Sequence, residues 1–263
     1  GAGGHLYDTK GDLTVDQIRR GFLYGDYVDA QRAELGTNAD GSGTTPIWGL
    51  VETGGAYTED TTAASYIQPA ELNQAVWMSI LHGARGIIYF DHSFAGPAQS
   101  DNNVFDTYYK TASNFPNTGN YANPSNVSMH AQVKATDALV AQLAPVIASP
   151  FALGYLTVTP KPVTCAVPCA SDGASVFSTT GIDTATKWYT GGGALTNGAY
   201  VFASPRASEK ATNIDATFTV ADASATKAVL VGESAREITI DPATHTFKDT
   251  FATGLTVHIY RIE

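Results

Sequence analysis

The chain has 263 residues, which suits one large domain or two small ones, and its hydrophobic content of 43% is enough for a substantial core. Fifteen Lys and Arg residues against 25 Asp and Glu residues give a net charge of -10, which argues against binding to nucleic acid or to an anionic membrane surface. No run of about 18 apolar residues is present, so we expect no transmembrane helix.

Helix and strand signals alternate through the first 150 residues. Apolar residues at helical spacing predict helices over 13–35, 69–82 and 126–148. Two short apolar runs, PIWGLVET at 46–53 and GIIYFD at 86–91, are typical of buried strands. Each run is followed by a long polar loop, 54–67 and 92–125. This order predicts an α/β unit with parallel strands, in which a site would lie where the strands end.

From residue 154 onward the pattern changes to short strands separated by Gly, Pro, Asn and Asp turns. The expected strands are 154–159, 175–180, 186–191, 199–204, 215–220, 227–232, 236–241 and 256–262. Such regular spacing is typical of an antiparallel β-sandwich. We therefore predict a boundary near residue 150, with an α/β unit over 1–150 and an all-β unit over 151–263.

The chain has two cysteines, Cys165 and Cys169, with three residues between them. A short-loop disulfide in a secreted protein and a pair of free thiols both fit this spacing, and we predict the disulfide. Low Lys content and few charges also indicate an extracellular protein. The first residues lack the basic and apolar regions of a signal peptide, so we expect the chain to begin after a targeting segment or within a longer polypeptide. No cluster of His, Cys or carboxylate residues indicates a metal site, and we expect no cofactor.

Three segments together resemble the C-terminal part of retaining glycoside hydrolases built on a (β/α)8 barrel with an appended β-sandwich. The first is PIWGLVETGG at 46–55, and the second is QPAELNQAVWMSILHGARGIIYFDHSF at 68–94. The third combines AYVFAS at 199–204, KAVLVGESAREITIDPATHTFKDTF at 227–251 and TVHIYRI at 256–262. In such enzymes a helix ending in His-Gly-Ala-Arg-Gly precedes the last barrel strand, and the sandwich closes with a Phe-x-Asp-x-Phe turn and a His-Ile-Tyr strand.

The resemblance implies that the two predicted parallel strands are strands seven and eight of a TIM barrel. A (β/α)8 barrel typically needs about 250 residues, and two parallel strands cannot close one. We therefore interpret the chain as the C-terminal portion of a larger enzyme, whose remaining strands are another chain or a missing N-terminal segment. A divergent small fold is the alternative.

Glu52 ends the first strand, where the resemblance implies the catalytic nucleophile of a retaining mechanism. Strand alternation places Trp48, Leu50 and Glu52 on one face, so the carboxylate would emerge where the strand ends. An ordinary solvated carboxylate is the alternative. Retaining glycosidases also need an acid/base carboxyl about 5–5.5 Å away, and this chain offers no candidate for it. We expect the chain alone to be inactive.

Four further residues are candidates for binding the carbohydrate substrate: Trp48, Tyr89, Asp91 and His92. Sugar sites use aromatic faces for apolar sugar surfaces and fixed polar groups for hydroxyls. Three of them also have a structural alternative: a core position for Trp48 and a hydrogen-bonded loop start for Asp91 and His92. In the all-β unit we expect Trp188 in the core, with a glycan-binding platform formed with Tyr189 as the alternative.

The sequence thus predicts a secreted or surface-displayed glycoside hydrolase that acts on a poly- or oligosaccharide through a glycosyl-enzyme on Glu52. The rival is a non-catalytic structural or glycan-binding protein of a surface or virion assembly that keeps the glycosidase fold. An inverting hydrolase is a third possibility, which a carboxyl separation of roughly 6.5–9.5 Å would indicate.

Overall fold

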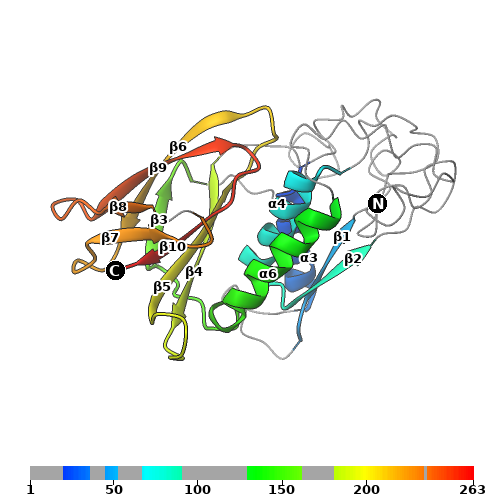
Figure 1. The fold of residues 1–263 in the computed structure, drawn as a ribbon, viewed down its shortest axis with the longest axis horizontal. Coiled ribbons are helices and arrows are strands. Elements are labelled where there is room, and N and C mark those ends of the chain that lie inside the picture. Colours follow the sequence, from blue (N-terminus) through cyan, green and yellow to red (C-terminus); the bar gives the residue numbers. More distant parts are fainter. Residues whose placement is uncertain (1–19, 36–44, 53–66, 91–128, 162–180, 234–235) are drawn as a thin grey trace, which may run out of the picture.

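The structure is a computed structural model that describes residues 20–35, 45–52, 67–90, 129–161, 181–233 and 236–263 (Figure 1). The first half of the described chain alternates helices and strands. These elements are α3 (Leu23–Leu35), β1 (Trp48–Glu52), α4 (Pro69–Leu81), β2 (Gly86–Phe90) and α6 (Met129–Ile147). The second half is made of strands: β3 (Leu156–Thr159), β4 (Ile182–Tyr189), β5 (Gly198–Pro205), β6 (Thr212–Val220), β7 (Lys227–Leu230), β8 (Glu237–Thr239), β9 (Thr246–Thr253) and β10 (His258–Ile262).

Helix α4 has the start and stop signals that the sequence predicts. Pro69 occupies the first turn, and the backbone N–H of Gln68 donates to the Glu71 carboxylate at 2.7 Å. This contact satisfies one of the N–H groups that a helix leaves unbonded at its start. Gly83 follows the helix with φ +97°, a left-handed conformation that costs least for glycine.

Strands β1 and β2 pair in parallel, which confirms the α/β pattern predicted for this part of the chain. Their register runs from Trp48 opposite Gly86 to Glu52 opposite Phe90. Helix α4 connects them, as a parallel pair requires a crossover. Among the described residues they form a two-stranded sheet, so each strand has one edge that pairs with no other described strand.

The remaining strands form two antiparallel sheets, and this pairing confirms the antiparallel prediction. One sheet has five strands in the order β4-β5-β10-β7-β8, and the other has three in the order β3-β6-β9. Strand β4 begins at Ile182, four residues before the predicted strand over 186–191. The predicted strand over 175–180 lies outside the described residues.

The Phe-x-Asp-x-Phe segment was expected to be a turn, and this prediction is wrong. It lies inside strand β9, which pairs with β6 from Thr246 to Thr253. Phe247, Asp249 and Phe251 are buried on one face of β9, while Lys248 and Thr250 are exposed on the other. This two-residue alternation is a strand signal, and it was obscured by the polar Asp at a buried position.

The helices lie between the β1–β2 pair and the five-stranded sheet, as Figure 1 shows. One hydrophobic cluster joins Val51 of β1 to Trp77 of α4 and Phe202 of β5. A second cluster fills the space between the two antiparallel sheets and includes Val201 of β5 and Phe218 of β6. The five-stranded sheet is therefore covered by helices on one face and by the three-stranded sheet on the other.

Gln74 of α4 joins the helices to the sheets through one side-chain amide. Its Nε2 lies 3.1 Å from Ser204 Oγ, 2.9 Å from the Pro205 carbonyl and 2.6 Å from the Gly254 carbonyl. The side chain is fully buried. The loss of this donor would therefore leave buried carbonyl groups without their partner.

We predict that Gln74→Ala lowers the free energy of unfolding by about 2–4 kcal/mol, because it leaves buried acceptors unsatisfied and removes packed atoms. Urea unfolding followed by circular dichroism measures this change. Gln31→Ala, on the exposed side of α3, is the matched control and should change stability by less than about 0.5 kcal/mol. Equal losses in the two variants would contradict the prediction.

Candidate functional site

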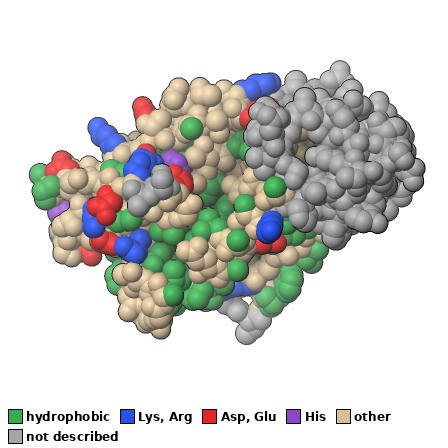
Figure 2. All heavy atoms as spheres, viewed as in Figure 1, with side chains coloured by type: hydrophobic (Ala, Val, Ile, Leu, Met, Phe, Trp, Pro, Cys, Tyr) green, Lys and Arg blue, Asp and Glu red, His purple; other side chains and the backbone are tan. Residues whose placement is uncertain are grey.

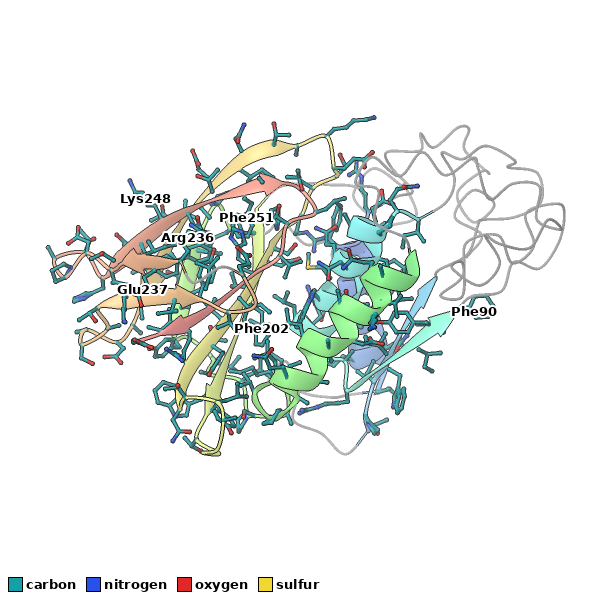
Figure 3. The ribbon with its side chains drawn as sticks, viewed as in Figure 1. Phe90, Phe202, Arg236, Glu237, Lys248 and Phe251 are labelled. Atoms are coloured by element: carbon teal, nitrogen blue, oxygen red, sulfur yellow. The ribbon has the colours of Figure 1, made fainter. Side chains whose placement is uncertain are left out.

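The candidate site lies where β1 and β2 end together. Glu52 is the last residue of β1 and pairs with Phe90, the last residue of β2. Figure 3 shows Phe90 at the tip of β2, on the far side of the helices from Phe202. Asp91 and His92, which follow β2 directly in the sequence, lie outside the described residues.

One face of the β1–β2 pair carries exposed apolar side chains, and we refer to Trp48, Leu50, Gly86 and Ile88 as the open face. Trp48 is 54% exposed, Leu50 52% and Ile88 47%. On the other face, Ile47 and Val51 are buried. The alternation that the sequence predicts for β1 is therefore confirmed for Trp48 and Leu50. Glu52 is the next alternate residue of β1, so its backbone position belongs to the same face as Trp48 and Leu50.

Trp48 packs flat against the sheet because its neighbour on β2 is a glycine. A Cβ atom placed on Gly86 would lie 2.6–2.8 Å from three carbon atoms of the Trp48 indole. Trp48 and Glu52 share a face but stand at opposite ends of β1, about 13 Å apart along the strand. The indole therefore lies away from the strand end that carries Glu52.

Tyr89 lies on the opposite face of the sheet from the open face. Its hydroxyl donates to Asp137 of α6 at 2.7 Å. Burial, followed by the hydrogen bond and the charge of Asp137, raises the pKa of Tyr89 above its ordinary value. The structure thus does not bring Tyr89 together with Trp48, although both were predicted to bind substrate.

Trp188 was expected in the core, but it is 43% exposed. Tyr155 contacts it edge-on, with ring centroids 5.6 Å apart, whereas Tyr189 is buried. Strand alternation explains the difference, because Trp188 and Tyr189 point to opposite faces of β4. The two cannot form one platform. Cys165 and Cys169, with their predicted disulfide, lie outside the described residues.

Sequence reasoning missed a buried group of charged residues between the helices and the five-stranded sheet. Arg206 Nη1 and Nη2 donate to the two carboxylate oxygens of Asp26 at 3.0 and 2.7 Å. Arg206 Nη1 also donates to Asp183 at 2.8 Å. These residues lie far apart in the chain and in no motif, so only their unusual burial identifies them.

Charge elsewhere is concentrated on the antiparallel sheets. Figure 2 shows most of the Lys, Arg, Asp and Glu side chains of this view at the end of the molecule formed by these sheets. There Arg236 donates to both oxygens of Asp249, at 2.6 and 2.8 Å. Burial opposes ionisation of Asp249, but bonds from His258, Arg236 and Tyr260 hold the pKa of its carboxyl well below its usual range. Its side-chain partners and the Thr250 backbone N–H, which donates to it at 2.8 Å, all belong to the same sheets or to the turn beside them, so this group is structural.

In the part of the chain that the structure describes, no three His, Cys, Asp or Glu side chains are grouped so that they could hold a metal ion. No helix in that part has the length and apolar character needed to cross a membrane. The chain matches no protein-family model and no curated protein.

We predict that Gly86→Ala lowers the free energy of unfolding by about 1–3 kcal/mol, because the new methyl group collides with the Trp48 indole. The same substitution in a Trp48→Ala background should cost much less, since the collision is gone. Urea unfolding of the four proteins forms a double-mutant cycle that isolates the contact. Additive effects would show that the indole does not pack on Gly86.

Proposed function

We propose that this chain supplies the nucleophile half of a retaining glycoside hydrolase that acts on a poly- or oligosaccharide. In this proposal β1 and β2 are the seventh and eighth strands of a (β/α)8 barrel. The two antiparallel sheets form the appended β-sandwich over residues 151–263. The observation that carries the proposal is the position of Glu52 at the end of β1, in parallel register with the end of β2.

The open face supports the assignment of β1 and β2 to a larger barrel. Parallel sheets are normally covered on both faces, but among the described residues helices cover one face of this pair and the other face is exposed. Two-stranded sheets are also too small to be stable alone. Further strands, from polypeptide beyond the described residues, would pair with the free edges and bury Trp48, Leu50 and Ile88. In that arrangement Trp48 fills the barrel interior near the start of the strands.

The proposed chemistry assigns one bond-forming step to Glu52. Its carboxylate attacks the anomeric carbon while the bond from that carbon to the leaving oxygen breaks. A second carboxyl group gives its proton to the leaving oxygen. The same group then removes a proton from water, which releases the sugar from Glu52. The second carboxyl belongs to one of the completing strands, so the chain alone is inactive. No redox cofactor is needed, because every step transfers only a proton or a glycosyl group.

We predict that Glu52→Gln lowers turnover at least 1,000-fold, because an amide cannot act as the nucleophile. The assay uses the native assembly, isolated with whatever polypeptide completes it, and a panel of aryl glycosides. Glu34→Gln, on the exposed side of α3, is the matched control and should retain full turnover. A glycosyl fluoride with fluorine at carbon 2, which slows release of the enzyme-bound sugar, should add one glycosyl mass to a peptide containing Glu52.

Two results would contradict the nucleophile assignment. One is unchanged turnover in Glu52→Gln, and the other is labelling of a different carboxylate. Turnover that falls equally in Glu34→Gln would indicate a general loss of structure.

The open face also suits the rival function, a non-catalytic subunit of a surface or virion assembly. An exposed Trp, Leu and Ile on one sheet face is the kind of surface that binds another protein subunit. This reading predicts a stable assembly that hydrolyses none of the glycosides, and that forms equally well from Glu52→Gln protein. The two functions are separated by the same assay.

A further inference from the structure

Six charged groups form a continuous chain between α3 and the five-stranded sheet, and we refer to them as the ionic joint. They are Asp26, Asp29, Arg32, His82, Asp183 and Arg206. Helix α3 contributes the first three, His82 caps the C-terminus of α4, Asp183 lies on β4 and Arg206 follows β5.

His82 stands between two carboxylates that come from different layers of the fold. Its Nδ1 lies 2.7 Å from Asp29 Oδ2, and its Nε2 lies 3.4 Å from Asp183 Oδ2. A carboxylate only accepts hydrogen bonds, so both ring nitrogens must carry a proton for both contacts to be favourable. A neutral imidazole carries one proton and would turn a lone pair toward one carboxylate.

The charges of the joint balance only when His82 is protonated. Three carboxylates then face three cations, because Arg206 bonds Asp26 and Asp183 while Arg32 bonds Asp29 at 3.2 Å. Arg206 is 1% exposed and Asp183 4%. Loss of the proton would leave a net negative charge between the layers, where water cannot screen it well.

We propose that His82 is a proton-dependent lock between the helices and the five-stranded sheet. With both ring nitrogens protonated it bonds α3 to β4, and loss of one proton weakens this joint. The inference is independent of the proposed hydrolase activity, because it concerns only contacts among described residues on the helix side of the sheet.

The electrostatic environment of His82 keeps the lock closed through neutral pH. Burial disfavours the charged ring, but the hydrogen bonds and charges of Asp183 and Asp29 outweigh it and raise the pKa of His82 to about 10. Burial likewise opposes ionisation of Asp183, yet His82 and Arg206 hold the pKa of its carboxyl below the ordinary value. A raised histidine pKa means that the stabilisation is complete below about pH 6.5 and is lost as pH rises toward 10.

Lys187 is a further basic residue beside the ionic joint, and its pKa shifts downward, whereas that of His82 shifts upward. Lys187 lies on the same face of β4 as Asp183, and its Nζ donates to the Ser149 carbonyl at 3.1 Å. Burial and the charges of Arg85 and Arg32 lower the pKa of Lys187 to about 7. Lys187 therefore carries little charge above pH 8. Between pH 8 and 10, the group that loses positive charge in this region is His82.

Trp77 is a natural reporter of the joint. It is buried on α4 and stacks on Phe202 of β5, with ring centroids 5.9 Å apart. The protein has three tryptophans, and the other two, Trp48 and Trp188, are exposed. A Trp48→Phe/Trp188→Phe protein therefore reports emission from the helix–sheet contact alone.

The first test is an NMR titration of the imidazole signals of the full chain. We expect the His82 ring signals to stay at their protonated positions from pH 5 to 8 and to move between about pH 9 and 11. Movement of these signals between pH 6 and 7 would overturn the proposal. This measurement uses the unaltered protein.

The second test follows Trp77 emission over the same pH range in the single-tryptophan protein. The emission maximum should shift to longer wavelength with the midpoint of the His82 titration. His82→Arg, which stays charged throughout, should abolish that shift. His258→Gln changes a buried histidine beside Asp249, outside the ionic joint, and should keep it. An emission maximum that stays constant while His82 loses its proton, or an identical shift in a folded His82→Arg protein, would overturn the lock. None of these readouts involves glycoside turnover.

Discussion

The buried guanidinium of Arg206 is the interaction on which the arrangement of layers depends. A cation that leaves water costs several kcal/mol unless carboxylates meet it with good geometry, and Arg206 is met by both oxygens of Asp26 and by Asp183. These bonds link α3 to the residue that follows β5 and so favour this placement of the helix. The net gain in stability from such a buried pair is often small, but a packing that separated Arg206 from its carboxylates would leave buried charges unpaired and is strongly disfavoured.

Helix α4 lies in the interior of this arrangement. Nearly every residue of α4 is buried, because β1 lies on one side of the helix and β4 and β5 lie on the other. A helix surrounded in this way has no polar stripe. The buried Gln74 donates its side-chain N–H groups to the carbonyl groups of Pro205 and Gly254. In the described part of the chain, the helices pack on one face of the β1–β2 pair. The opposite, open face is the physical reason to propose further strands, and the end of β1 is the reason to propose chemistry at Glu52.

Much of this architecture could be predicted from the residues in each segment. The apolar spacing and the terminal signals at Pro69 and Gly83 predicted α4 within one residue at its C-terminal end. Other features depended on which side of a strand faces which layer. Tyr89 and Trp48 were both candidates for substrate binding, but they lie on opposite faces of the β1–β2 sheet, and the Tyr89 hydroxyl donates to Asp137 of α6. Trp188 was expected in the core, but it is 43% exposed on β4. The Phe-x-Asp-x-Phe segment was expected to be a turn, but it lies in strand β9 with Asp249 at a buried position.

The sequence by itself determined the order of helices and strands, the parallel and antiparallel character of the sheets, and the alternation that groups Trp48 with Leu50. These features depend on local spacing, on caps and on connection lengths, which neighbouring residues specify. Only the tertiary structure decided the partners of the buried polar groups. Arg206 meets Asp26 and Gln74 meets Gly254 across 180 residues of chain in each case. Such pairs form because layers packed by nonspecific apolar contacts bring them within hydrogen-bond distance, and no local pattern encodes which distant residue will arrive there.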